Sequence, residues 1–89
     1  MLVKVKQLEI AGPHRLRLWF TDGSMGERDF RQELEQGGPM AQSLLDPAFF
    51  AQASLEFGAP TWPNGYDMAP WALHRDMQAE GLLRQAEHA

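Results

Sequence analysis

TWPNGYDMAPW, residues 61–71, is the segment around which the fold is organised. Asn64-Gly65 predicts a tight turn, because both residues accept positive φ with little steric cost. The proline before this pair favours an extended conformation for Trp62, which therefore ends a strand. Asp67 is a predicted helix N-cap, and Pro70 fits the first helical turn, where its missing N–H has no partner to lose. The predicted order is strand, turn and helix.

The same segment gathers aromatic side chains at one corner. Trp62, Tyr66 and Trp71 each have a large apolar area to bury. One interpretation is a structural corner that seats the last helix on a sheet, and the other is an aromatic recognition patch. Together with Trp19, which is predicted on the outer face of a strand, these residues are the partner-binding candidates.

The first third of the chain predicts an antiparallel meander. Alternating apolar residues indicate a strand over residues 3–10, and its change of phase indicates a bulge near Lys6-Gln7. The next strand, residues 15–21, alternates large apolar residues with polar ones. Asp22-Gly23 is a hairpin turn that returns the chain as a third strand over residues 24–30.

Beyond this meander the pattern changes to short helices and then back to strands. Apolar residues four apart predict a short helix that starts near Phe30, and Asp46-Pro47 predicts the start of another. Alternation returns over residues 52–57, a fourth strand that turns at Gly58-Ala59 into a short edge strand at residues 60–62.

The element order β-β-β-α-α-β-β-α predicts an α+β fold with a mostly antiparallel sheet of about five strands. Residues 1–80 form one predicted domain, which is the size expected of a single core. Residues 81–89 form a tail with three alternatives: an extension of the last helix, a frayed end, or a contact of Leu82-Leu83 with a second chain. A sheet edge offers another route to a homodimer.

The composition excludes several classes of protein. The 89 residues contain no cysteine, which excludes disulfides, thiol catalysis and thiolate metal sites and fits a cytoplasmic location. No apolar run approaches the length of a membrane span, and the N-terminus lacks the apolar core of a signal peptide, so no membrane association is expected. The net charge of −4 arises in residues 46–89, where six acids face two arginines. Such a charge opposes broad nucleic-acid binding and suits a basic protein partner.

Catalytic patterns are weak. The serines lack a nucleophile elbow, and His14, His74 and His88 are scattered along the chain. We therefore expect no catalytic residue, no metal and no cofactor. The alternative is a small-ligand or enzymatic site at the aromatic corner that uses Tyr66, Asp67 and His74.

A second alternative is weak binding of single-stranded nucleic acid. Lys4, Lys6, Arg15 and Arg17 are predicted beside Trp19 on the outer face of the first hairpin. Basic side chains around an aromatic on a sheet face are typical of some single-strand binders. The same residues also suit an exposed antiparallel face on which lysine and arginine deter edge-to-edge aggregation.

Four segments, taken in order, resemble a known bacterial family. Its pattern has a strand ending in Asp-Gly, an Asp-Leu pair, a helix start with Asp and Phe, and a Trp-Pro-Asn-Gly turn that leads into a helix. The corresponding segments here are Val3 to Ile10 followed by Leu16-Arg17-Leu18-Trp19-Phe20-Thr21-Asp22-Gly23, then Asp29-Phe30, Leu44-Leu45-Asp46-Pro47-Ala48-Phe49-Phe50 and Trp62-Pro63-Asn64-Gly65-Tyr66-Asp67-Met68-Ala69-Pro70-Trp71-Ala72-Leu73. The chain thereby resembles the family catalogued as domain of unknown function 2442, and the last segment is the most specific.

The resemblance implies a small α+β domain without an assigned activity. It implies a partner more than a reaction, because members of that family are often encoded beside another small protein in pairs that look like toxin–antitoxin operons. The family pattern favours a tyrosine where this chain has His74 and an apolar residue where it has Arg28. We therefore hypothesise a non-enzymatic, antitoxin-like or regulatory domain that binds the product of a neighbouring gene.

Overall fold

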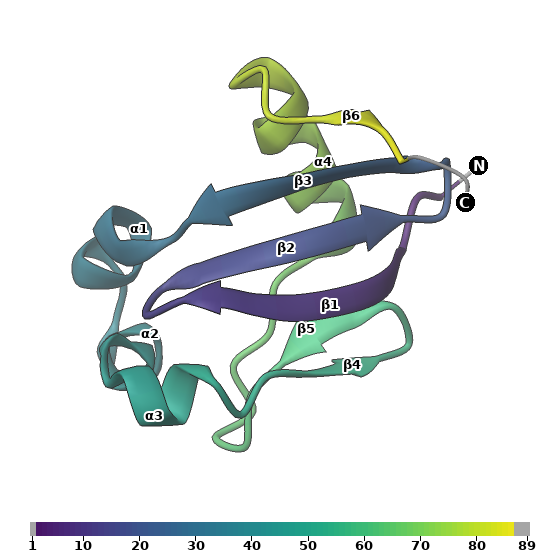
Figure 1. The fold of residues 1–89 in the computed structure, drawn as a ribbon. Coiled ribbons are helices and arrows are strands. Elements are labelled where there is room, and N and C mark those ends of the chain that lie inside the picture. Colours follow the sequence, from purple (N-terminus) through teal and green to yellow (C-terminus); the bar gives the residue numbers. More distant parts are fainter. Residues whose placement is uncertain (1, 87–89) are drawn as a thin grey trace.

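The computed structural model describes residues 2–86 of the chain (Figure 1). The strands are β1 (Val5–Gly12), β2 (Arg15–Phe20), β3 (Ser24–Asp29), β4 (Ser54–Glu56), β5 (Ala59–Thr61) and β6 (Arg84–Gln85). The helices are α1 (Arg31–Gln36), α2 (Pro39–Gln42), α3 (Pro47–Phe50) and α4 (Pro70–Ala79), with a 3-10 turn η1 (Ser43–Leu45) between α2 and α3. The α+β class and the short helices are therefore confirmed.

The larger sheet has the strand order β1-β2-β3-β6, and every neighbouring pair is antiparallel. Its first three strands are the predicted meander, with Asp22-Gly23 in the turn between β2 and β3 and Gly23 at φ +91°. The bulge predicted near Lys6-Gln7 is present, because the register of β1 on β2 shifts between Val5 and Gln7. The described residues form six strands in two sheets, compared with the prediction of about five strands.

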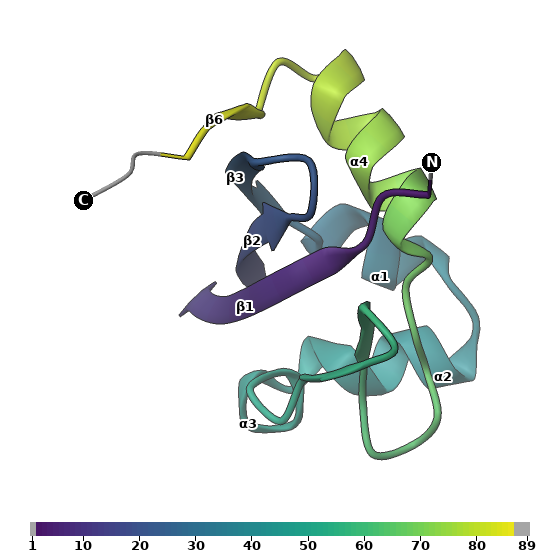
Figure 2. The same cartoon turned by 90° about the vertical axis from the view of Figure 1, so that its right-hand side faces the viewer.

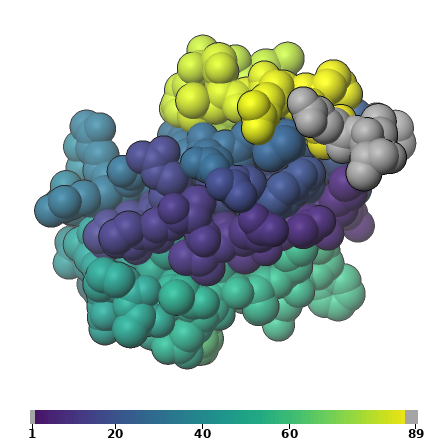
Figure 3. All heavy atoms as spheres, in the orientation of Figure 1, coloured from purple at the N-terminus to yellow at the C-terminus, as the bar shows by residue number. Residues whose placement is uncertain are grey.

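The described helices cover one face of this sheet. Leu16, Leu18 and Phe20 of β2 are fully buried on that face, as their alternation predicts. Figure 2 shows α1 and α4 on the same side, while α2, α3 and the β4–β5 hairpin lie beyond the β1 edge. Leu34 of α1 and Met77 of α4 close the core. Side chains of β1, β2 and β3 form the other face, which is turned to the viewer in Figure 3.

Asn64-Gly65 forms the predicted tight turn. Gly65 has φ +90°, and its N–H donates to the Trp62 carbonyl oxygen at 2.9 Å. The Asn64 side chain braces the turn, because its Oδ1 accepts from the Tyr66 N–H at 3.0 Å and its Nδ2 donates to the Met40 carbonyl oxygen at 3.1 Å. The turn is thereby tied to α2.

The helix after this turn is capped differently from the prediction. Pro70 lies in the first helical turn as predicted, but it is the first helical residue, the N-cap is Ala69, and no described side chain caps the helix. The predicted capping role of Asp67 is wrong. Its backbone forms an antiparallel bridge with Thr61, so strand-like pairing continues past Asp67 and the helix begins only afterwards.

The chain after α4 forms a strand that the sequence did not predict. Gly81 has φ +73°, and the next N–H, that of Leu82, donates to the Met77 carbonyl oxygen at 2.9 Å. This left-handed turn ends the helix and places β6 beside the start of β3. An extension of the helix through Leu82 and Leu83 is therefore wrong, while residues 87–89 of the predicted tail lie outside the described residues.

The β4–β5 hairpin turns one residue earlier than predicted. Glu56 pairs with Ala59, so Phe57-Gly58 is the two-residue loop. Phe57 has φ +52° and is 95% exposed, although its alternation with Leu55 predicted a strand position. Gly58 belongs to the turn both in the prediction and in the structure, where it has φ +79° and where an added Cβ would lie 2.7 Å from the Lys4 Cβ, so glycine is required at this position.

Candidate functional site

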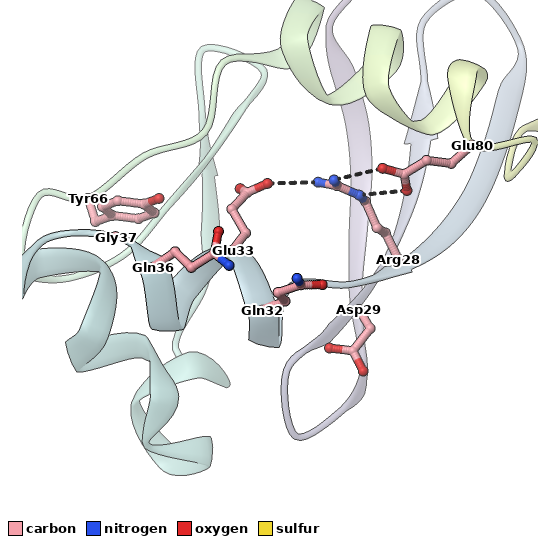
Figure 4. Close-up of a pocket in the computed structure, with 8 residues that line it drawn as sticks. All are labelled: Arg28, Asp29, Gln32, Glu33, Gln36, Gly37, Tyr66 and Glu80. Atoms are coloured by element: carbon pink, nitrogen blue, oxygen red, sulfur yellow. Dashed lines mark hydrogen bonds and ion pairs between the residues drawn. The ribbon is translucent and has the colours of Figure 1, made fainter.

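A groove separates α1 from the chain that leads into α4. Its cavity volume is about 690 Å³, and Figure 4 shows the side chains that line it. A smaller hollow of about 210 Å³ continues along α4. Both are lined by Arg28, Glu33 and Tyr66, so they form one continuous surface, which we call the α1–α4 groove. The other lining residues are Asp29, Gln32, Gln36, Gly37 and Glu80 in the larger part, and Asp67, Met68, Ala69, Ala72, Leu73 and Asp76 in the smaller part.

Arg28 crosses the groove and joins three elements. It lies opposite Leu16 in the sheet register, on the helix-covered face, but its guanidinium leaves the core and its side chain is only 14% exposed. Its Nε and one terminal nitrogen donate to the two Glu80 carboxylate oxygens at 3.0 and 2.9 Å, and the other donates to Glu33 at 3.2 Å (Figure 4). The guanidinium carbon also lies 5.1 Å from the centre of the Phe30 ring. Arg28 thus links β3 to both α1 and the end of α4.

The charge of the groove is negative. Burial alone would lower the pKa of Arg28, but the hydrogen bonds and charges of Glu80 and Glu33 raise it, so the guanidinium stays charged. Burial raises the pKa of Tyr66, and the carboxylates of Glu33 and Asp67 raise it further. The lining residues provide the carboxylates of Asp29, Glu33, Asp67, Asp76 and Glu80 against the single guanidinium of Arg28. Such a wall attracts cationic groups of a ligand or partner.

Trp71 lies on α4 and is linked to the groove through Arg75, which stacks on the indole and donates to Asp76 in the groove lining. Trp71 is 57% exposed and precedes Ala72, which lines the groove. The Arg75 guanidinium lies 5.0 Å from the centre of the indole ring and also donates to Asp76 at 2.9 Å. Tryptophan and arginine are both enriched among the residues that contribute most to protein–protein binding.

The four aromatic candidates have different environments. Trp62 is only 2% exposed, and its Nε1–H donates to the Phe50 carbonyl oxygen at 2.9 Å, so the interpretation as a structural corner is confirmed for Trp62 and its prediction as an exposed partner-binding residue is wrong. Its indole is large enough to fill the space between the Phe50 and Tyr66 rings, at centroid distances of 5.6 and 6.0 Å. Tyr66 is half-buried in the groove wall. Trp19 is half-buried, between strands β1 and β3.

His74 does not join Tyr66 and Asp67. Its Nε2 lies 2.8 Å from Asp22 Oδ2, and its ring packs edge-on against Phe20 at 5.1 Å. Asp22 and His74 line a different hollow, of about 350 Å³, which does not include Tyr66 or Asp67. The structure therefore does not bring together the three residues of the predicted ligand or enzymatic site.

The Asp22 carboxylate holds the β2–β3 turn to α4. Burial alone would raise the pKa of Asp22, but hydrogen bonds from the Ser24 hydroxyl and N–H, at 2.6 and 3.0 Å, and the contact with His74 lower it below its usual value. Because the carboxylate is ionised, His74 Nε2 carries the proton and donates.

We predict that Asp22→Asn lowers stability at pH 7 and that the difference from wild type disappears in acid. A carboxyl group with a lowered folded-state pKa stabilises the fold above its unfolded pKa of about 3.9 and loses this effect as pH falls through the folded pKa. Urea midpoints measured from pH 7 to about pH 2.5 check this window. Glu56→Gln, at an exposed strand position, is the control, and a difference for Asp22→Asn that widens toward low pH would contradict the prediction.

Acids interrupt the basic residues of the first hairpin. Arg17 donates to Glu27 at 2.7 Å and to Glu9 at 3.1 Å, and Arg15 lies 3.7 Å from Asp29. The side-chain stem of Lys4 packs over Gly58. Lys6 is exposed on β1. These residues therefore form a mixed ion-pair surface rather than a continuous positive strip, which weakens the case for nucleic-acid binding.

Sequence patterns could not have revealed the most distinctive site residues. Glu80 meets Arg28 across 52 positions of sequence, and Arg75 gains its importance only from its place over Trp71.

In the described residues, no three His, Asp or Glu side chains gather in a way that would hold a metal ion. None of the described helices is long and apolar enough to cross a membrane. Comparison with known proteins finds no matching family model, no curated relative and no matching solved structure.

Proposed function

We propose that this chain is a cytoplasmic, non-enzymatic interaction domain that binds a protein partner through Trp71 and the α1–α4 groove. The observation that carries the proposal is the exposed Trp71 indole, restrained by Arg75 at the border of an acidic groove. An exposed aromatic anchor beside charged groups is the usual arrangement of a binding hot spot.

The groove favours a partner with basic side chains. Its acids lie on rigid elements, because Arg28 fixes Glu33 of α1 and Glu80 at the end of α4 relative to β3. Tyr66 adds an aromatic wall within the same surface. A lysine or arginine of the partner would find a carboxylate-rich recess next to the Trp71 anchor.

The resemblance to domain of unknown function 2442 suggests which partner to test first. Its paired-gene arrangement points to the product of the neighbouring gene and to an antitoxin-like or regulatory role. The two departures from the family pattern have local structural roles here, since Arg28 bridges two helices and His74 holds the β2–β3 turn. The proposal therefore does not depend on a tyrosine hydroxyl at position 74.

We predict that Trp71→Ala weakens binding of the purified neighbouring-gene product by about 30-fold or more while leaving the fold intact, as expected of a hot-spot tryptophan. Calorimetric titration measures the effect, and affinity should fall with rising salt because the groove acts through charge. Ile10→Thr, at an exposed apolar position of β1, is the matched control. If wild-type protein forms no complex and co-expression leaves the growth effect of the neighbouring product unchanged, the proposal fails.

A further inference from the structure

The tip of the β4–β5 hairpin carries a residue that the fold itself does not need. Phe57 has φ +52°, and no other non-glycine residue in the described chain has positive φ. It is also 95% exposed, more than any other large apolar residue of the described chain. Left-handed backbone is unfavourable for a bulky side chain, and an exposed phenyl ring gains nothing from burial.

The position of Phe57 is fixed by its neighbours rather than by its own side chain. Gly58 must be glycine because it packs against Lys4, and its carbonyl oxygen accepts from the Val5 N–H at 2.9 Å. The pairing of Glu56 with Ala59 then leaves Phe57 as the first residue of a two-residue turn with positive φ at both positions. Asn or Gly suits such a position best, so the backbone gives no reason for phenylalanine.

We infer that Phe57 is an aromatic anchor that inserts into an apolar recess of the protein partner, an inference that rests on the proposed function. The hairpin is tied to β1 through Gly58, so the ring is presented from a rigid support. Residues held in an unfavourable backbone conformation occur mainly at functional sites, and an exposed aromatic ring can bury a large area when it binds.

The surface of this chain argues against a second copy as the occupant. Both parts of the α1–α4 groove include Arg28, Glu33 and two further carboxylates in their lining, and a phenyl ring placed there would remove these charged groups from water. The apolar hollow beside Leu2 and Val3 measures about 90 Å³, whereas a cavity that accepts benzene measures about 150 Å³. A lipid surface is also disfavoured, because Glu56 adjoins the tip and the chain has a net charge of −4. A different protein with an apolar recess fits best.

The test compares wild type, Phe57→Asn and Phe57→Tyr. We expect Phe57→Asn to raise Tm by roughly 4 °C, because asparagine tolerates the left-handed turn, and to weaken binding of the neighbouring-gene product by at least about 10-fold. Phe57→Tyr keeps the ring and should keep most of the affinity. Ile10→Thr should change neither quantity.

The outcomes separate this inference from the proposed function. Equal affinities of wild type and Phe57→Asn, with Trp71→Ala impaired, would overturn the role of Phe57 and leave the proposed function standing. A wild-type protein that binds no neighbouring-gene product would overturn both. If analytical ultracentrifugation shows a dimer that Phe57→Asn dissociates, the ring binds a second copy of this chain. If the protein sediments with phosphatidylcholine vesicles and Phe57→Asn abolishes this, the ring binds a lipid surface. Either result would overturn the inference that Phe57 inserts into a recess of a protein partner.

Discussion

Trp62→Ala is expected to lower the free energy of unfolding by about 4 kcal/mol, which is roughly half of the stability of a domain this size. The substitution removes a buried indole that lies between Phe50 and Tyr66. It also removes the shorter of two hydrogen bonds to the Phe50 carbonyl oxygen, because the Trp62 Nε1–H bond at 2.9 Å is lost and only the Ala53 N–H at 3.3 Å remains. Urea denaturation followed by far-UV circular dichroism measures the change.

Two further variants separate packing from hydrogen bonding. Trp62→Phe retains part of the ring contact but not the N–H donor, so we expect a loss of about 2 kcal/mol. Trp71→Ala removes an exposed indole and should change stability by less than about 0.5 kcal/mol. Equal losses for Trp62→Ala and Trp71→Ala would show that Trp62 does not hold the corner together.

The parts of the fold that could be predicted from the sequence are those that depend on local sequence. Turn chemistry and alternation located the meander, the Asn64-Gly65 turn and the start of α4, because these depend on neighbouring residues. The error at Asp67 arose because a bridge to Thr61 took precedence over local capping preference. Likewise, the alternation over residues 52–57 could not show that Glu56 pairs with Ala59, which places the hairpin turn one residue earlier.

The candidate site was less predictable than the fold. Tyr66 and Trp71 were named from the sequence, and both lie at the α1–α4 groove or its border. The groove itself depends on Arg28, which lies opposite Leu16 in the sheet register. Only the packing of α1 and α4 beside β3 provides the carboxylates that accept the hydrogen bonds of the Arg28 guanidinium and balance its charge. Long-range ion pairs of this kind leave no periodic signal in a sequence.

The close approach of β3 to the end of α4 leads to the second large prediction. Gly26 weakens a strand by its own propensity, yet it lies where the turn after α4 passes over the sheet. A Cβ added there would lie 2.3 Å from the Leu82 carbonyl oxygen, 3.1 Å from its carbonyl carbon and 3.2 Å from Met77 Cε. The backbone of Leu82 must move to relieve this clash, so we expect Gly26→Ala to lower the free energy of unfolding by about 3 kcal/mol.

The clash should also detach β6 before the rest of the sheet. The Ala86 N–H donates to the Gly23 carbonyl oxygen at 2.9 Å only while the chain after Leu82 keeps its path. Hydrogen exchange of the Ala86 amide in Gly26→Ala should therefore accelerate more than that of amides in β2. Gly38→Ala is the matched control, because a Cβ added at Gly38 meets no atom within 4 Å. Unchanged protection of Ala86 together with unchanged stability would mean that the turn after α4 does not rest on β3.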